Sequence, residues 1–151
     1  MFSDADIRVL KLLQSNLDAP KNELAEAAGM SPSTLWRRMN ELQTVGAIRK
    51  RVALLDPDIL GFPICVFLSV NLIGHDKPIR DGFEAFVTDT PEILECFSIT
   101  GGFDYMLIVR SASVAAFETF LMDKILGHQF VATATSQISM RQHKYTTELP
   151  L

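Results

Sequence analysis

The stretch KNELAEAAGMSPSTLWRRMNELQTV, residues 21–45, decides the fold of the N-terminal part of the chain. Its residues 23–28 are typical of a short helix, which Gly29 ends because glycine tolerates the left-handed conformation at a helix C-terminus. Ser31 and Pro32 start a second helix at once, Ser31 as its N-cap and Pro32 in its first position. Two helices joined by a glycine-containing turn of about three residues form a helix-turn-helix unit.

The helix predicted over residues 32–45 has two chemically different faces. At about 3.6 residues per turn, the apolar residues Leu35, Met39 and Leu42 share the side that faces the core. The opposite side is short, polar and positively charged, which suits the base edges and phosphates of a DNA major groove. It consists of Ser33, Arg37, Asn40 and Thr44, with Thr34 close by. An ordinary solvated helix face is the alternative interpretation.

The flanking segments extend this motif in both directions. An earlier helix is predicted from the cap Ser3 or Asp4, with Ile7 and Leu10 at helical spacing. After Gly46, residues 47–55 are predicted to form one or two strands, as a basic hairpin or wing whose cations contact phosphates. The DNA contacts predicted for the whole region are Ser31, Ser33, Thr34, Arg37, Arg38, Asn40, Thr44, Arg49, Lys50 and Arg51. Trp36, at the edge of the polar face, is expected to pack against the preceding helix or a partner rather than to contact DNA.

The distribution of charge supports a local DNA interface. The net charge is −4, yet residues 1–55 carry two more basic than acidic residues, whereas the remainder carries six more acidic than basic ones. A basic cluster alone is weak evidence, since most such clusters are solvated surface. Confined to the predicted helix-turn-helix and the segment after it, the positive charge is where a small DNA-binding module needs it.

The second half of the chain alternates between strands and helices. Strands are predicted over residues 62–72, 93–100, 105–110 and 131–140, an amphipathic helix over 77–88, and another helix after the cap Ser113. The order βαββαβ is that of a ferredoxin-like domain. One face of such a sheet is buried under its own helices and the other needs a partner, so we expect a homodimer. The predicted class is α+β, with a DNA-binding domain over 1–55, a linker over 56–61 and an effector-binding and oligomerisation domain over 62–151.

Several other classes of protein are excluded by what the sequence lacks. No apolar run reaches the roughly 18 residues of a membrane span, and the start of the chain lacks the pattern of a signal peptide, so we expect a cytoplasmic protein without membrane contact. Cys65 and Cys96 lie in apolar stretches and are interpreted as buried hydrophobic residues. The three histidines are scattered, and no phosphate loop, nucleophile elbow or metal motif is found. We therefore predict no catalytic residues, no metal and no cofactor.

Taken together, the chain from Asp6 onward resembles the Lrp/AsnC (feast/famine) transcription regulators. The resembling pieces are, in order, Glu23-Leu24-Ala25, Gly29-Met30-Ser31, Arg38-Met39-Asn40-Glu41-Leu42, Val45-Gly46-Ala47-Ile48, Leu55-Asp56-Pro57, Leu60-Gly61, Pro91-Glu92-Ile93 and Thr100-Gly101-Gly102-Phe103-Asp104-Tyr105. No single piece is specific, but the set at these spacings is.

The resemblance implies a sequence-specific transcription regulator that binds an operator in double-stranded DNA. It also implies dimers that assemble further, for example into octamers, and an amino acid effector bound near the turn at residues 101–105. Backbone amides at the glycines could meet the carboxylate of the effector and Asp104 its ammonium group. The expected effector residues are Thr100, Gly101, Gly102, Asp104, Tyr105, Thr133, Thr135 and Ser136. Alternatively, the two glycines only form a hairpin turn that Asp104 caps.

Two features depart from the family pattern, and two other functions are alternatives. Pro20 stands where members often carry arginine, and residues 128–131 replace a common Gly-Val step near the expected effector region. Siroheme decarboxylases are similar in fold and length, but their basic stretch contains a histidine, and Arg49-Lys50-Arg51 does not. A sensor that has lost DNA binding is the other alternative, against which the intact polar helix face argues.

Overall fold

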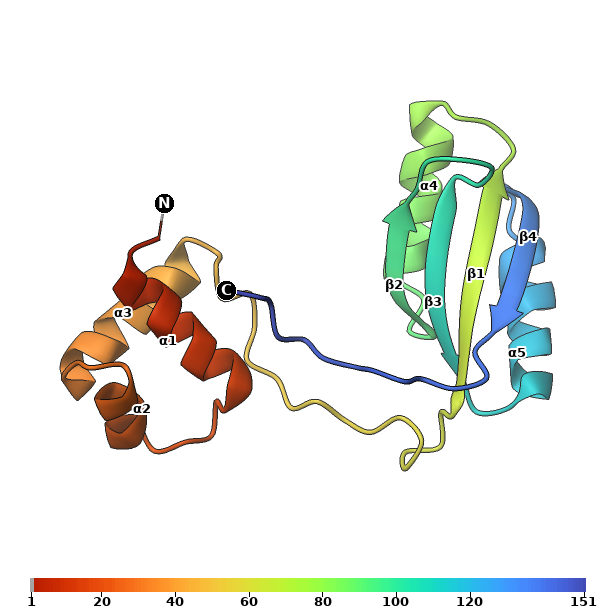
Figure 1. Cartoon of the computed structure of the whole chain (residues 1–151). Coiled ribbons are helices and arrows are strands. Elements are labelled where there is room, and N and C mark those ends of the chain that lie inside the picture. The colour runs from red at the N-terminus through yellow and green to blue at the C-terminus, as the bar shows by residue number, and fades with distance from the viewer. Residues whose placement is uncertain (1) are drawn as a thin grey trace. The chain divides into compact units, whose positions relative to one another are not determined.

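The computed structural model describes residues 2–151, which form two compact units (Figure 1). The first comprises the chain up to Ala53 together with His143–Leu151, and the second comprises Leu54–Gln142. The last residues thus belong to the first unit, and the expected functional division into residues 1–55, 56–61 and 62–151 stays a prediction. Between Phe2 and Leu151, no helix combines the length and the apolar character needed to cross a membrane.

The first unit contains the three predicted helices, α1 (Asp4–Ser15), α2 (Lys21–Ala27) and α3 (Pro32–Thr44). Gly29 ends α2 with a φ of 68°, and the Ser31 hydroxyl accepts a hydrogen bond from the Thr34 N–H at the start of α3. These local signals are strong enough to place the helix boundaries without tertiary contacts. The core of the unit consists of Val9, Leu24, Ala25, Ala28, Leu35, Met39 and Leu42.

The predicted basic hairpin is not formed. Residues 47–55, all of them described, contain no strand. A tight hairpin needs a turn, for which glycine and asparagine are the usual residues, and this segment contains neither. The segment thus lacks the usual turn residues of a tight hairpin, and the prediction of strands was wrong for it.

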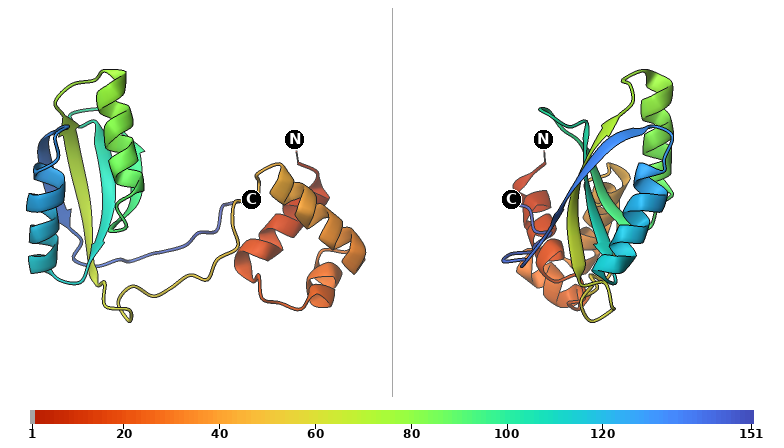
Figure 2. Two further views of the ribbon diagram at one scale, coloured as in Figure 1. Left: turned by 180° about the vertical axis from the view of Figure 1, so that it is seen from behind. Right: turned by 90° about the vertical axis from the view of Figure 1, so that its right-hand side faces the viewer.

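The second unit is a four-stranded antiparallel sheet with the order β2-β3-β1-β4. Its elements are β1 (Ile64–Leu72), α4 (Lys77–Thr88), β2 (Ile93–Ser98), β3 (Tyr105–Ser111), α5 (Val114–Phe120) and β4 (Val131–Ile138); α5 continues into a π-helical segment, η1 (Leu121–Leu126). The helices cover one face of the sheet (Figure 2). This arrangement confirms the predicted βαββαβ domain.

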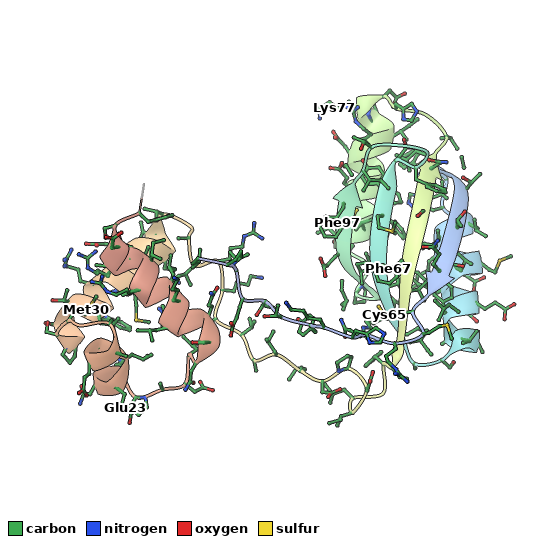
Figure 3. The ribbon with its side chains drawn as sticks, in the orientation of Figure 1. Glu23, Met30, Cys65, Phe67, Lys77 and Phe97 are labelled. Atoms are coloured by element: carbon green, nitrogen blue, oxygen red, sulfur yellow. The ribbon has the colours of Figure 1, made fainter. Side chains whose placement is uncertain are left out.

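The two faces of the sheet differ in burial. On the helix side, Val66, Leu68, Val70 and Leu107 are fully buried beneath α4 and α5. The other face is uncovered and carries large apolar side chains such as Phe67 and Phe97, 39% and 50% exposed (Figure 3). Alternation along each strand explains both faces, since successive side chains point to opposite sides.

Helix α4 packs closely on the segment that precedes β4. A Cβ atom at Gly82 would lie only 2.2 Å from Cε2 of Phe130, so the ring occupies the space that any other residue at position 82 would need. The His128 ring packs against both this ring and Phe86: it is tilted by 33° to Phe86 with the centroids 4.3 Å apart, and it meets Phe130 edge-on at 5.5 Å. Burial there lowers the pKa of His128. Residues 128–131, which replace the Gly-Val step common in the family, thus contribute an aromatic cluster that packs against α4.

Candidate DNA-binding face and effector pocket

The exposed side of α3 carries the polar residues predicted to contact DNA. Ser33, Arg37, Asn40 and Thr44 are all exposed, on the side of α3 opposite its buried leucines and methionine. Their neighbouring interactions are local: the Thr44 hydroxyl donates to the Asn40 carbonyl at 2.9 Å. The face therefore presents donors, acceptors and a cation to the solvent, as a groove of DNA requires.

Arg37 forms a weak ion pair on this face. Its guanidinium lies 2.5 Å from the Glu41 carboxylate, and the two side chains are 60% and 54% exposed. Exposed pairs at this spacing stabilise a helix by only about 0.3–0.5 kcal/mol. A phosphate or a guanine could therefore replace Glu41 as the partner of Arg37 at little cost.

Arg38 has a different environment from its neighbour. Its guanidinium donates to the Asp6 carboxylate at 2.6 Å and lies 3.4 Å from the Ser3 hydroxyl, and its side chain is only 25% exposed. Hydrogen bonds from the Ser3 hydroxyl and backbone N–H, with Arg38 beside them, hold the pKa of Asp6 below its ordinary value. Arg38 thus joins α3 to the start of α1, and the structure does not bring it to the predicted face.

Ser31 and Thr34 shape the start of α3. The Ser31 hydroxyl lies 2.8 Å from that of Thr34, besides capping the helix. After the helix, Arg49, Lys50 and Arg51 are exposed in an extended segment, and Arg51 reaches the Gln43 side chain at 3.5 Å. These three cations follow the C-terminal end of α3 without the strands that were expected to hold them.

Trp36 packs as expected against the preceding helix. The ammonium group of Lys21, at the start of α2, lies over its ring, 4.5 Å from the centroid. The side chain is 45% exposed. A cation above an indole ring is a favourable pair, so this contact supports the expected packing on the preceding helix, and the absence of a DNA contact stays a prediction.

In the second unit, the predicted effector turn is fixed by Asp104. Its N–H donates to the Val70 carbonyl and to the Asn71 side chain, and its carboxylate accepts from the Leu72 N–H at 2.8 Å. The other carboxylate oxygen lies 3.5 Å from Nδ1 of His75. The Asp104 carboxylate therefore caps the end of β1 and not the glycine turn itself, while its other oxygen faces the exposed imidazole of His75.

A hollow of about 140 Å³ lies beside this carboxylate. It brings opposite charges together, since Arg80 from α4 and Asp104 both line it. No ion-pair partner of Arg80 is found among residues 2–151. The complete lining is Leu72, His75, Arg80, Ser98, Ile99, Asp104 and Tyr105. A cation and a carboxylate on one small hollow can bind the two ends of a zwitterion.

A second hollow, of about 340 Å³, adjoins the first. Ser98 and Tyr105 line both, and Glu84, Val87, Thr88 and Cys96 complete the second. The Tyr105 hydroxyl donates to the Glu84 carboxylate at 2.9 Å. Burial, and then the neighbouring Glu84, raise the pKa of Tyr105, while burial raises the pKa of the Cys96 thiol to about 11. Neither group ionises near neutral pH, so Glu84 supplies the charge of this second hollow.

The remaining predicted effector residues are spread over the sheet. Thr133 and Thr135 pair with Asn71 and Ser69, on the uncovered face, whereas Ser136 alternates to the helix side. Thr100, Gly101 and Gly102 are exposed in the turn, where Gly101 has a φ of 118°, and line neither hollow. The structure therefore brings together Asp104 and Tyr105 but not the other six.

Sequence reasoning missed the cation of the hollow. Arg80 follows Lys77 in an amphipathic helix, where it is indistinguishable from an ordinary solvated residue. One signal in the sequence could have indicated it. Arg80 lies one turn after Asp76, the N-cap of α4, and only a short loop separates the start of this helix from the end of β1, so Arg80 must lie near that end of the sheet.

Comparisons with known proteins give one consistent result. Residues 2–49 match the family model of a winged helix-turn-helix DNA-binding domain, and residues 65–149 match that of the Lrp/AsnC ligand binding domain. The glutamate uptake regulatory protein of Zymomonas mobilis is 34% identical over 99% of this chain and 91% of its own length. The DNA-binding transcriptional activator DecR of Escherichia coli is 30% identical over 100% and 99%.

Solved structures agree over the same length. A transcriptional regulator from Neisseria meningitidis, solved as a complex with L-Met, superposes with a TM-score of 0.93 at 35% identity over 99% of this chain and 97% of its own. An AsnC family transcriptional regulator from Agrobacterium tumefaciens gives 0.92 at 33% identity over 99% and 97%.

Proposed function

Since the chain belongs to the Lrp/AsnC family of transcription regulators, we propose that it reads its operator with the exposed face of α3. The observation that carries this proposal is the polar face of Ser33, Arg37, Asn40 and Thr44 opposite a buried apolar stripe. Arg49, Lys50 and Arg51 add phosphate contacts beside it. In this division, residues 1–55 bind DNA in the cytoplasm, and residues 62–151 bind the effector and assemble the oligomer. The protein is a regulator and not an enzyme.

The DNA-binding face is tested by electrophoretic shift with the upstream region of the gene. Arg37→Ala should weaken specific binding by about 1–3 kcal/mol, a cost typical of losing a base-contacting arginine. Lys11→Ala is the matched control, because it removes an exposed cation from α1 of the same unit. If the two variants bind alike, the assigned face is wrong.

We further propose that the effector is an amino acid whose head group enters the hollow between Arg80 and Asp104. Arg80 would bind the carboxylate, and the outer oxygen of Asp104 the ammonium group. Support comes from the opposite charges on one hollow and from the related Neisseria regulator that was solved with L-Met. The side chain of the effector would extend toward the adjoining hollow.

Thermal shift with a panel of free amino acids tests this pocket. Asp104→Asn is the sharper variant, because its amide oxygen can still accept the Leu72 N–H while the charge is lost. Arg80→Gln removes the opposite charge. Both variants should lose the shift that the wild type shows, and a deaminated analogue of the active amino acid should shift none of the three. Equal shifts in all three proteins would remove these groups from the site.

We also propose that the uncovered face of the sheet is the homodimer interface, with dimers assembling further into larger multiples such as octamers. The exposed rings of Phe67 and Phe97 lie on this face, and an apolar surface of this kind is stable when a second copy covers it. Phe67→Glu should shift the mass measured by light scattering to that of the monomer. An unchanged mass would assign the interface to another surface.

A further inference from the structure

The last residues of the chain contact the DNA-binding unit. His143–Leu151 follows β4, yet it is part of the compact unit that contains α1, α2 and α3, where Figure 1 shows the C-terminus. The contact is made by Gln14, near the end of α1. Its carboxamide nitrogen donates to the Leu149 carbonyl at 2.9 Å, and its oxygen accepts from the Leu149 N–H at 3.0 Å.

This pair of hydrogen bonds satisfies both backbone groups of one residue. A side-chain amide has the donor and the acceptor of a peptide group, so Gln14 binds Leu149 as a neighbouring strand would. The segment is shaped for this contact by its own turns: the Glu148 N–H donates to the Thr146 hydroxyl, and the Leu151 N–H to the Leu149 carbonyl. Recognition thus depends on the backbone, and the Leu149 side chain stays 66% exposed.

So small a contact is effective only because it is intramolecular. Two exposed hydrogen bonds with little apolar burial would not hold two separate molecules together at ordinary concentrations. A tether supplies a high effective concentration of the segment. At its other end the segment is held by the sheet, where the Ser139 N–H donates to the Cys65 carbonyl of β1 at 2.8 Å.

We propose that the end of α1 at Gln14 is a docking site for the C-terminal segment of the same chain. The DNA-binding unit is then joined to the sheet by two connections, the chain around Leu54 and the docked segment. Because α1 is also held to α3 by Arg38 and Asp6, the second connection restrains the helix that we propose reads DNA. Only this last consequence rests on the proposed function.

Cross-linking of the full-length protein tests the docking. Lys11 and Lys144 are exposed, one on α1 and one in the segment, and a short amine-reactive linker should join them. The yield should fall several-fold in Gln14→Ala and stay unchanged in Gln43→Ala, which makes the same truncation on α3. Mixing unlabelled with ¹⁵N-labelled protein separates links within a chain from links between chains. In an equal mixture with exchanged subunits, mixed-isotope links near the one half that random pairing gives, or equal yields in the wild type and Gln14→Ala, would overturn the proposal.

The restraint is tested independently with the one tryptophan of the chain, Trp36, which lies in the DNA-binding unit. Time-resolved anisotropy should show a larger fast component in Gln14→Ala than in the wild type or Gln43→Ala, because the undocked unit reorients on its single remaining connection. This readout does not involve DNA or an amino acid, so it separates a failure of the docking proposal from a failure of the proposed function. Identical decays in the three proteins would refute the restraint.

Discussion

The two adjacent arginines of α3 should respond to truncation in opposite ways. Arg37→Ala removes an exposed cation whose only partner among residues 2–151 is Glu41, one turn away on the same helix. Arg38→Ala removes a side chain that is 25% exposed and joins α3 to Asp6 of α1 at 2.6 Å. We therefore expect Arg37→Ala to lower the affinity for DNA at nearly unchanged stability, and Arg38→Ala to lower the stability of the first unit.

The size of the second effect follows from the environment of the pair. Exposed ion pairs contribute about 0.2–1 kcal/mol, and hydrogen bonds to charged groups about 1.5–3 kcal/mol. Because the side chains of Arg38 and Asp6 are neither fully exposed nor fully buried, we expect Arg38→Ala to lower the free energy of unfolding by about 1–2 kcal/mol, between these two ranges. For a domain of this size each kcal/mol corresponds to roughly 4–8 °C in Tm. The exposed pair at Arg37 should contribute only about 0.3–0.5 kcal/mol.

Unfolding of the first unit is followed through Trp36 fluorescence, and DNA affinity is measured well below Tm. Asp6→Asn should cost about as much as Arg38→Ala, and the double variant should cost less than the sum of the two because both changes break one contact. The lowered pKa of Asp6 means that its contribution is complete above about pH 4 and is lost as the pH falls through the lowered pKa. Wild-type stability combined with a loss of DNA affinity in Arg38→Ala would show that Arg38 contacts DNA and would refute this reasoning.

Three further outcomes are expected. Glu41→Gln should strengthen DNA binding severalfold at low salt by releasing Arg37, and a gain that persists at high salt would argue against an electrostatic cause. Gly82→Ala should destabilise the second unit by about 1–3 kcal/mol, because its Cβ would meet the Phe130 ring. Adding Phe130→Leu to this variant should recover part of the loss, as measured by calorimetry. Wild-type stability of Gly82→Ala alone would contradict the close contact between positions 82 and 130. Burial lowers the pKa of His128, so the contribution of this residue to the free energy of unfolding should be constant above about pH 6.5 and fall at lower pH. Urea titrations should show a weaker pH dependence in His128→Gln. An unchanged pH dependence in this variant would contradict the prediction.

Local signals in the sequence were sufficient for most of the fold. Gly29, Ser31 and Pro32 determine helix ends through their own backbone preferences, and the alternation in β1 and β3 determines which side chains are buried. The basic hairpin failed because positive charge and β propensity do not supply a turn. Its error shows that the composition of a segment does not determine its shape, while the predicted phosphate contacts of Arg49, Lys50 and Arg51 stay a prediction.

The candidate sites were less predictable, because they depend on contacts that are distant in the sequence. Arg38 is as basic as Arg37, and only its distance to Asp6 reveals the different role. Arg80 and Asp104 line one hollow only because the fold brings the start of α4 beside the end of β1. Gln14 forms hydrogen bonds with Leu149, near the opposite end of the chain, and no pattern within a helix or strand predicts such a contact.

The contact between Gly82 and Phe130 has a consequence for how this domain can diverge. A ring at position 130 leaves no room for a side chain at position 82, so position 82 cannot gain a side chain while the ring keeps its place. Relatives that retain an aromatic residue before the last strand should therefore retain glycine at this point of the helix, whereas relatives with a small residue before that strand can accept alanine or larger. The two positions should evolve as a pair.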